Sequence, residues 1–237
     1  MVETMAENLS VKQLEAWYGE SKVLHGMDFE LRAGEVVTLL GRNGAGKTTT
    51  VKAIMGMIEK RTGSIRLDGI EMIASPPYDI ARKGVGFCPE DRGIFASLSV
   101  RENLMLPPKL ADGGMTLDEI LSLFPNLKER LNSQGTKLSG GEQQMLAVAR
   151  VLRTGARILL LDEPTEGLAP IIIQQIAEAI STLKKLGFTI LLIEQNVAFV
   201  SRLADRHYVV ELGRIVEEIP AAELASRQSA LANYLGL

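Results

Sequence analysis

Residues 41–48 read Gly41-Arg42-Asn43-Gly44-Ala45-Gly46-Lys47-Thr48 and match in full the pattern G-x-x-x-x-G-K-[ST]. In this pattern the glycines let backbone N–H groups turn toward phosphate oxygens. The lysine bridges the outer phosphates of a nucleotide, and the hydroxyl can ligate Mg²⁺. The alternative interpretation is an ordinary strand-to-helix turn. A chance match to this pattern is expected in only roughly one in a hundred chains of this length. The stretch therefore predicts a nucleotide-binding loop in an α/β fold.

The flanking sequence has the strand–loop–helix order that this loop requires. Residues 35–40 are a short apolar run of β-forming residues, and a helical pattern follows over residues 47–58. Two more buried-strand patterns, residues 157–161 and 188–193, enclose a helix expected over 170–186. Strands that are apolar throughout and alternate with helices are typical of a parallel sheet covered on both faces.

Other regions of the chain have different patterns of strand-forming and helix-forming residues. Residues 9–31 read as two strands with a turn at Gly19, which predicts a β subdomain near the amino end. Residues 92–153 have a helical pattern broken by prolines and glycines, including a helix expected from Glu142 to about Leu152. We expect one domain, with a core of residues 1–91 and 154–237 and an inserted helical subdomain of residues 92–153. In the tail, Leu224, Leu231 and Leu235 have helical spacing and predict a docking helix.

Composition limits the class of protein. Hydrophobic residues make up 46% of the 237 residues and charged residues 23%, which permits a sizeable core. Lys and Arg total 26 against 29 Asp and Glu, and the net charge of −3 argues against a protein that coats nucleic acid or anionic lipid. The single cysteine, Cys88, fits a reducing compartment. We expect no signal peptide and no transmembrane segment, because no apolar run is long enough.

Two acids end the apolar run 158–161. A carboxylate at the end of a buried strand near the nucleotide loop suits a Mg²⁺ partner, and Asp162 is the candidate. The next residue, Glu163, is positioned to polarise an attacking water as a general base. A simple polar turn before Pro164 is the alternative interpretation of the same residues.

A second glycine-containing motif, Leu138-Ser139-Gly140-Gly141-Glu142, precedes a predicted helix. Exposed N–H groups at a helix start suit an anion. Because the loop at 41–48 already holds phosphate, a second anion site in one protomer is redundant. The motif is best explained if it serves a nucleotide held by a partner protomer.

With these motifs the sequence resembles the ATP-binding cassette (ABC) ATPases, whose signature motif reads LSGGQ; Glu142 replaces the usual Gln. The resemblance covers essentially the whole chain. It implies a P-loop NTPase (RecA-like) core with a parallel sheet, an N-terminal antiparallel β subdomain and an inserted α-helical subdomain. It also implies ATP and Mg²⁺ as cofactors and hydrolysis at a site completed by a second cassette. The nucleotide-binding residues it implies are Tyr18, Gly41, Arg42, Asn43, Gly44, Ala45, Gly46, Lys47, Thr48 and Thr49.

The resemblance also assigns roles to residues that depart from the usual pattern. Glu90 stands where many cassettes have a Gln that contacts Mg²⁺ through water, so the implied metal set is Thr48, Glu90 and Asp162. Gln195 stands where most cassettes have the switch His, and it joins Glu163 and Lys47 in the implied catalytic set. Neither His25 nor His207 follows the strand that would let it substitute. In the loop before Pro170, Ala169 stands where an Asp is common.

These departures permit two interpretations. If the motifs have degenerated, the chain would be a binding-only or slow partner in an asymmetric dimer. If instead the chain belongs to a subfamily with its own set of motif residues, it would be active. Because the other motif residues are all present, we favour an active ATPase. Together with Glu90, the runs 166–170, 194–196 and 234–236 resemble the second, smaller ATPase of bacterial branched-chain amino-acid importers, and also the ATPases of urea and short-amide importers.

That resemblance implies partners and a location. They are a second, related ATPase (a homodimer is the alternative), two separate membrane permeases and, indirectly, a periplasmic solute-binding protein. The chain would lie peripherally on the cytoplasmic face of the bacterial inner membrane. Arg92, Phe95 and Leu98 are candidate permease contacts, with ordinary core packing as the alternative. A non-transport ABC protein acting on ribosomes or DNA is the competing class, but the negative net charge and single signature argue against it, and no nucleic-acid partner is expected.

Overall fold

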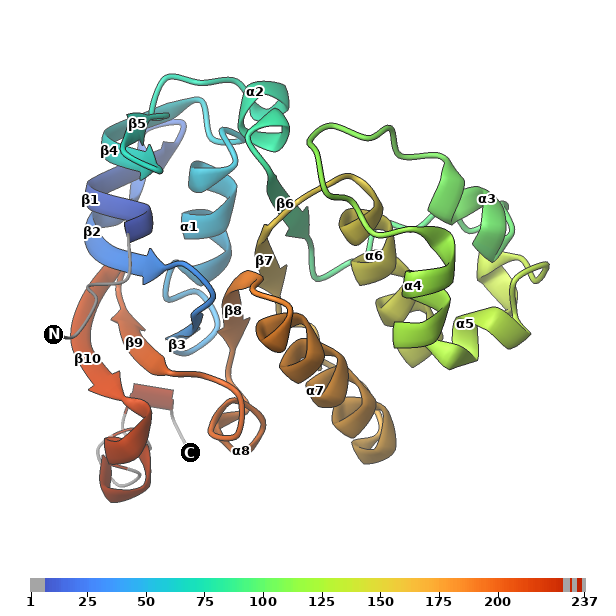
Figure 1. Ribbon diagram of the computed structural model, residues 1–237. Coiled ribbons are helices and arrows are strands. Elements are labelled where there is room, and N and C mark those ends of the chain that lie inside the picture. Colours follow the sequence, from blue (N-terminus) through green and yellow to red (C-terminus); the bar gives the residue numbers. More distant parts are fainter. Residues whose placement is uncertain (1–6, 228–230, 232–233, 236–237) are drawn as a thin grey trace, which may run out of the picture.

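The strands form two sheets (Figure 1). The computed structural model describes residues 7–227, 231, 234 and 235. The larger sheet has the order β10-β9-β3-β8-β7-β6 and the smaller the order β2-β1-β4-β5. The larger sheet contains β3 (Val36–Leu40), β6 (Val85–Cys88), β7 (Ile158–Asp162), β8 (Thr189–Glu194), β9 (Arg206–Glu211) and β10 (Arg214–Pro220); the smaller contains β1 (Glu7–Tyr18), β2 (Ser21–Arg32), β4 (Lys60–Leu67) and β5 (Ile70–Glu71).

The larger sheet is parallel except for β10, which runs antiparallel to β9. Its central strands are apolar at every position because both faces are buried. In β8, Ile190 and Leu192 pack into a core shared with the helices on one face. Leu191 and Ile193 pack on the other face, in a core shared with α1 (Lys47–Ile54) and the smaller sheet.

Most of the remaining helices lie on the side of the molecule away from the smaller sheet, but α2 (Pro77–Arg82) lies on the side of the smaller sheet and packs Ile80 into the same core (Figure 1). None of the helices in the part of the chain that the structure describes has the length and apolar character to cross a membrane. Capping boxes begin two of these helices: Ser99 with Glu102 begins α3 (Val100–Met105), and Thr116 with Glu119 begins α4 (Leu117–Leu123). These helices are α2 (Pro77–Arg82), α3 (Val100–Met105), α4 (Leu117–Leu123), α5 (Pro125–Glu129), α6 (Gly140–Arg153), α7 (Pro170–Lys185) and α8 (Val197–Val200).

The predicted fold class is confirmed, with differences at some element ends. Helix α1 ends at Ile54 rather than near residue 58, and a turn containing Gly56 at φ 73° follows it. Helix α6 begins at Gly140, two residues before the expected start. The boundaries at residues 92 and 153 stay a prediction. The helices of this region have no separate core, since Leu104 and Ile120 pack in the same cluster as β8.

The tail docks on the core as expected: Leu224, Leu231 and Leu235 are buried. Residues 221–227 form a 3₁₀ helix. The helix that the sequence predicts for the tail also covers residues 228–230, 232–233 and 236–237, which lie outside the described residues. Residues 1–6 of the predicted core lie outside them too.

The strand order brings three predicted motifs to one edge of the larger sheet. Strand β8 lies between β3 and β7, and all three are parallel, so their carboxyl ends are neighbours. The loop at 41–48 follows β3, Glu163 follows β7 and Gln195 follows β8. Residues far apart in the sequence therefore meet where ligands bind in open α/β sheets.

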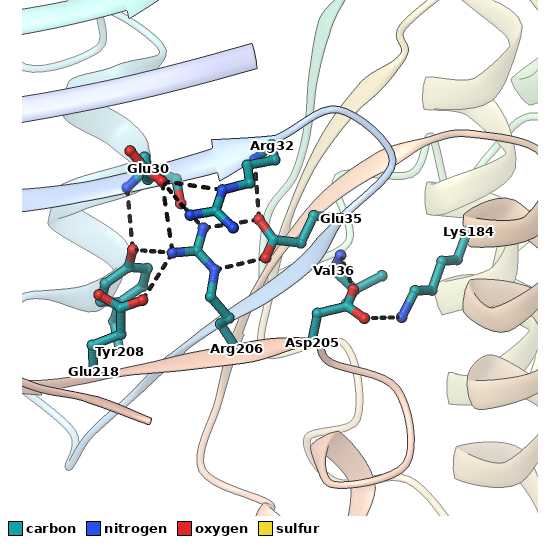
Figure 2. Close-up of polar contacts among 9 residues, drawn as sticks. All are labelled: Glu30, Arg32, Glu35, Val36, Lys184, Asp205, Arg206, Tyr208 and Glu218. Carbon is teal, nitrogen blue, oxygen red and sulfur yellow. Dashed lines mark hydrogen bonds and ion pairs between the residues drawn. The ribbon is translucent and has the colours of Figure 1, made fainter. Parts of the chain in front are cut away.

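At the opposite end of β9, Arg206 joins the two sheets (Figure 2). It donates to both carboxylate oxygens of Glu35, at 2.6 and 2.9 Å, and to Glu218 at 2.8 Å. It also donates to the backbone carbonyl of Glu30 in β2 at 3.0 Å and to the Tyr208 hydroxyl at 2.9 Å. The Arg206 and Glu35 side chains are only 11% and 8% exposed, so this two-pronged pair is largely removed from water.

A neighbouring carboxylate attaches α7 to the same edge (Figure 2). Asp205 accepts from Lys184 of α7 at 2.7 Å and from the backbone N–H of Val36 at 3.0 Å. Together, Asp205 and Arg206 fix the amino ends of β3 and β9, which sets the position of the strand that leads into the loop at 41–48.

We predict that Arg206→Met lowers the free energy of unfolding by about 3–5 kcal/mol, because it leaves a buried carboxylate without its cation. Urea unfolding measures the loss. The double variant R206M/E35Q removes the stranded charge as well and should recover at least about half of the loss. An Arg206→Met protein as stable as the wild type would contradict the role of this ion pair in joining the sheets.

Candidate nucleotide-binding site

A cavity of about 320 Å³ lies where the carboxyl ends of β3, β7 and β8 meet. A larger groove of about 750 Å³ lies elsewhere, between α4, α5, α6 and α7, and includes none of the predicted site residues. Chemistry rather than size therefore identifies the candidate site. The smaller cavity is lined by Val23, Asn43, Gly44, Gly46, Lys47, Thr48, Thr49, Glu90, Glu163 and Glu166.

Close packing fixes the start of the glycine-rich loop. A Cβ on Gly41 would lie 2.4 Å from the backbone oxygen of Val210 in β9, so only glycine fits against the neighbouring strand. Helix α1 begins at Lys47, within the stretch 41–48. Its first N–H groups and positive dipole end therefore face the cavity, an arrangement suited to phosphate.

Lys47 is 4% exposed, and its ammonium is held by the chain itself. It donates to the carbonyl oxygens of Gly41 at 2.7 Å and Arg42 at 3.0 Å, and Nζ lies 3.4 Å from Glu163 Oε1. An ammonium has only three protons to donate. A phosphate that binds Lys47 must therefore displace at least one of these oxygens.

Asp162, the last residue of β7, is 1% exposed and accepts from Thr48 Oγ1 at 3.0 Å. Burial raises the pKa of Asp162 to about 6; the charges of Glu163 and Glu90 add to the rise, and the hydrogen bond from Thr48 opposes it. A buried carboxylate and a hydroxyl oxygen side by side are hard oxygen donors of the kind that Mg²⁺ prefers. The residues present thus fit a divalent cation beside the loop.

Gln195 contacts both the loop and Glu163. Its Nε2 donates to Asn43 Oδ1 at 2.5 Å and lies 3.2 and 3.3 Å from the two carboxylate oxygens of Glu163. Glu163 has φ 45°, in the left-handed region, and its N–H donates to the Ile193 carbonyl at 2.9 Å. The structure therefore brings together the three residues predicted as catalytic, Lys47, Glu163 and Gln195.

Two further acids reach this cavity. Glu90 lines it as expected, and Glu166 lines it without having been predicted as a site residue. Burial raises the pKa of Glu166, and the nearby charges of Glu163 and Glu90 raise it further. Among the described residues, no group of three or more His, Cys, Asp or Glu side chains is arranged to hold a metal ion by itself.

Tyr18 and the histidines lie apart from this cavity. Tyr18 is 49% exposed at the end of β1 and is not among the lining residues, so its nucleotide contact stays a prediction. His207 is buried in β9, with Nδ1 2.7 Å from Thr38 Oγ1, and burial lowers its pKa to about 4. His25 lies in β2. Neither histidine occupies the place of Gln195.

The motif at 138–142 also lies outside the cavity. Ser139 caps α6: its Oγ accepts from the N–H of Glu142 at 3.3 Å, while its own N–H donates to Glu142 Oε2 at 2.7 Å. Glu142 also accepts from Arg130 Nε at 3.2 Å, a charged contact that explains a glutamate at this position. Since the motif does not reach the chain's own cavity, its role toward a partner's nucleotide stays a prediction.

Close helix packing accounts for one glycine of this motif. A Cβ on Gly141 would lie 2.3 Å from Ile172 Cγ2 in α7. Gly141 therefore brings the start of α6 against α7, and Leu138 is buried beside it. Ser139, by contrast, is exposed, and its hydroxyl lies within hydrogen-bonding reach of the Glu142 carboxylate.

The sequence carries only weak signals that Glu166 and Val23, the two remaining lining residues, reach this cavity. Glu166 follows Glu163 by three residues in a turn in which its N–H donates to the Glu163 carbonyl at 3.1 Å, so a turn of this kind puts both acids at one cavity. Val23 lies in β2 of the other sheet, and only the packing of the two sheets brings it to the loop.

Comparisons with known proteins give the family. A family model described as ABC transporter matches residues 24–166. The high-affinity branched-chain amino acid transport ATP-binding protein BraG of Pseudomonas aeruginosa is 44% identical over 231 residues, which cover 96% of this chain and 99% of that protein. The lipopolysaccharide export system ATP-binding protein LptB of Escherichia coli is 31% identical and covers 96% of this chain and 97% of its own length.

A solved structure agrees with these matches. The structure of an ATP binding subunit of an ABC transporter has a TM-score of 0.79 and 29% identity, and the alignment covers 94% of each chain. This chain therefore shares its fold and much of its sequence with proteins that are named for ATP binding.

We predict that Asp162→Asn stabilises the protein measured without nucleotide or divalent cation. The folded-state pKa of about 6 lies above the ordinary value of 3.8, so the wild type loses stability as pH rises through this range, whereas the variant does not. The variant should be more stable by about 2–3 kcal/mol near pH 8, and the difference should vanish near pH 4. Urea unfolding across this range measures it. A variant less stable than the wild type at pH 8 would contradict this electrostatic account of Asp162.

Proposed function

The chain belongs to the ABC transporter family, and we propose that it is the ATP-hydrolysing subunit of an importer for branched-chain amino acids. The observation that carries the ATPase part is the placement of Glu163 between Lys47 and Gln195 at the nucleotide loop. The substrate class rests on the 44% identity to BraG, which extends over 99% of that protein.

In the proposed reaction, water attacks the γ-phosphate of ATP and gives ADP and phosphate. Glu163 takes the proton of the attacking water as general base. Before ATP binds, Glu163 Oε1 lies 3.4 Å from the Lys47 ammonium. Phosphate oxygens that engage Lys47 would draw it away from Glu163 and leave that carboxylate to orient water.

The same cavity provides the other proposed contacts. The backbone N–H groups and side chains of residues 41–49 hold the phosphates, and Gln195 donates to the γ-phosphate. Thr48 and Asp162 would hold Mg²⁺, with Glu90 as a further ligand through water, and the bound ion would neutralise charge on the phosphates. Tyr18 stacks on adenine, and its 49% exposure leaves the ring accessible for this.

We propose that a second cassette completes the site. Residues Leu138, Ser139, Gly140, Gly141 and Glu142 would contact the partner's ATP, and the exposed Ser139 hydroxyl and the start of α6 supply donors for it. The resemblance to the smaller of two importer ATPases favours a heterodimer with a related, larger cassette over a homodimer.

The proposed contact with two membrane permeases lies beside a cavity of about 250 Å³ between the sheet and the helical region. Arg92 lines this cavity together with Pro89 and Arg150. Phe95 is 45% exposed, with the Arg150 guanidinium 4.7 Å from its ring centre. An exposed aromatic ring held by a cation beside a cavity suits an inserted element of another protein.

The location and the remaining partners follow from this proposal. The chain binds permeases at the cytoplasmic face of the bacterial inner membrane, and a periplasmic solute-binding protein delivers the solute to them. Nucleic acid is not among the partners, in keeping with the net charge of −3. Uptake of urea or short amides is the alternative substrate class, and the lower identity to LptB, 31%, makes export the less favoured direction.

We predict that Glu163→Gln abolishes uptake while preserving ATP binding, because the amide cannot accept the proton of water. Loss of a general base lowers turnover by about 10²–10⁴-fold. The variant, placed in the native host, is assayed for uptake of radiolabelled leucine and of urea, and the purified chain is assayed for ATP affinity.

Glu59→Gln, which removes an exposed acid just before β4, is the matched control and should transport as the wild type does. If the Glu163→Gln strain takes up both leucine and urea at the wild-type rate, Glu163 is excluded as the base. Loss of urea uptake with intact leucine uptake would show that the substrate class is urea or short amides rather than branched-chain amino acids.

A further inference from the structure

Glu194, the last residue of β8, is a buried carboxylate for which the proposed reaction has no role. It is 3% exposed and lies one residue before Gln195. Burial raises the pKa of Glu194, and the hydrogen bonds that it accepts oppose this rise. A buried carboxylate is costly unless its oxygens are hydrogen-bonded, so its partners indicate what it does.

The two carboxylate oxygens of Glu194 serve two different loops. Oε1 accepts from the N–H of Thr165 at 3.1 Å and from the Thr165 hydroxyl at 2.7 Å. Oε2 accepts from the backbone N–H groups of Gln195 at 3.3 Å and Asn196 at 3.4 Å. One side chain thus joins the loop after β7 to the loop after β8, through donors that are all neutral.

Both of these loops carry residues of the proposed reaction. The loop after β7 starts with Glu163, whose N–H donates to the Ile193 carbonyl at 2.9 Å. The loop after β8 carries Gln195, whose amide lies 3.2 Å from Glu163 Oε1. A shift of one loop relative to the other would separate these two side chains.

The loop after β7 also touches the motif proposed to bind the partner's nucleotide. The N–H of Leu168 donates to the Thr165 carbonyl at 3.3 Å. Leu168 Cδ2 would lie only 3.4 Å from a Cβ added to Gly140, so the Leu168 side chain lies close to the start of α6. The loop that Glu194 anchors therefore lies between the motif at 138–142 and the catalytic cavity.

We propose that Glu194 is a positioning residue: by binding Thr165 and the backbone of Gln195 together, it holds the Gln195 amide against Glu163. The inference rests on the proposed ATPase function. It assigns Glu194 no contact with substrate, because its effect passes through Gln195.

The test uses Glu194→Gln, because an amide of the same shape has one acceptor oxygen where the carboxylate has two. One of the two loops then faces an N–H₂ group instead of an oxygen and is released. In the complex purified from host membranes through this subunit, we expect kcat for ATP hydrolysis to fall by about tenfold or more, with KM for ATP changed by less than about twofold. A residue that only supports the fold would not separate kcat from KM in this way.

Gln195→Ala supplies the decisive comparison. If Glu194 acts through Gln195, the double variant E194Q/Q195A is no slower than Gln195→Ala alone, within about twofold. The inference would be overturned if the losses in kcat of the two single variants multiply in the double variant. It would also be overturned if the Glu194→Gln complex has wild-type kcat. Glu211→Gln, at the exposed end of β9, is the matched control and should retain wild-type kcat and KM.

If Glu194→Gln prevents assembly, Thr165→Val provides the same test more mildly, because it removes one donor and keeps the carboxylate. We expect its kcat to fall by about threefold or more, again with no further loss when Gln195→Ala is added. Failure of the proposed function looks different: the wild-type complex would then show no ATP hydrolysis that depends on Glu163, whatever residue stands at 194.

Discussion

The contact between the Lys47 ammonium and the Glu163 carboxylate is the interaction on which the site depends. Both groups are nearly buried, 3.4 Å apart, at the point where three parallel strands end. The same lysine is bound by the carbonyls of Gly41 and Arg42, so the loop is already folded around a positive charge. In the proposed reaction, a nucleotide that brings phosphate to this lysine would exchange one set of oxygens for another, and this exchange would link phosphate binding to the release of Glu163 for chemistry.

Buried charge elsewhere in the sheet supports this arrangement. At the opposite end of the sheet, Arg206 and Glu35 form a paired contact that ties both sheets together and stabilises the fold. At the end that carries the cavity, the buried carboxylates of Asp162 and Glu194 accept hydrogen bonds from hydroxyl and backbone N–H groups. Acidic side chains gather at this end of the sheet, where a bound cation would offset their charge.

The sequence predicted much of this because the decisive features are local. Apolar runs followed by Lys47, Asp162 and Glu163 indicate strands, a phosphate loop and strand-end acids without knowledge of the strand order. The contact of Gln195 with Asn43 depends on β8 lying beside β3, an arrangement that no local pattern specifies. The two-loop role of Glu194 was likewise hidden, since Thr165 is 29 residues away in the sequence. The early end of α1 reflects a turn that helical periodicity does not register.

We propose that this chain drives transport as one ATPase of a membrane complex. The most direct measurement is to tag the chain in its native host, solubilise the membranes gently, and identify every co-purifying protein with its stoichiometry. We expect two polytopic permeases and a second, distinct cassette in equal amounts with this chain. Recovery with ribosomes, with DNA-bound proteins or without any membrane protein would contradict it.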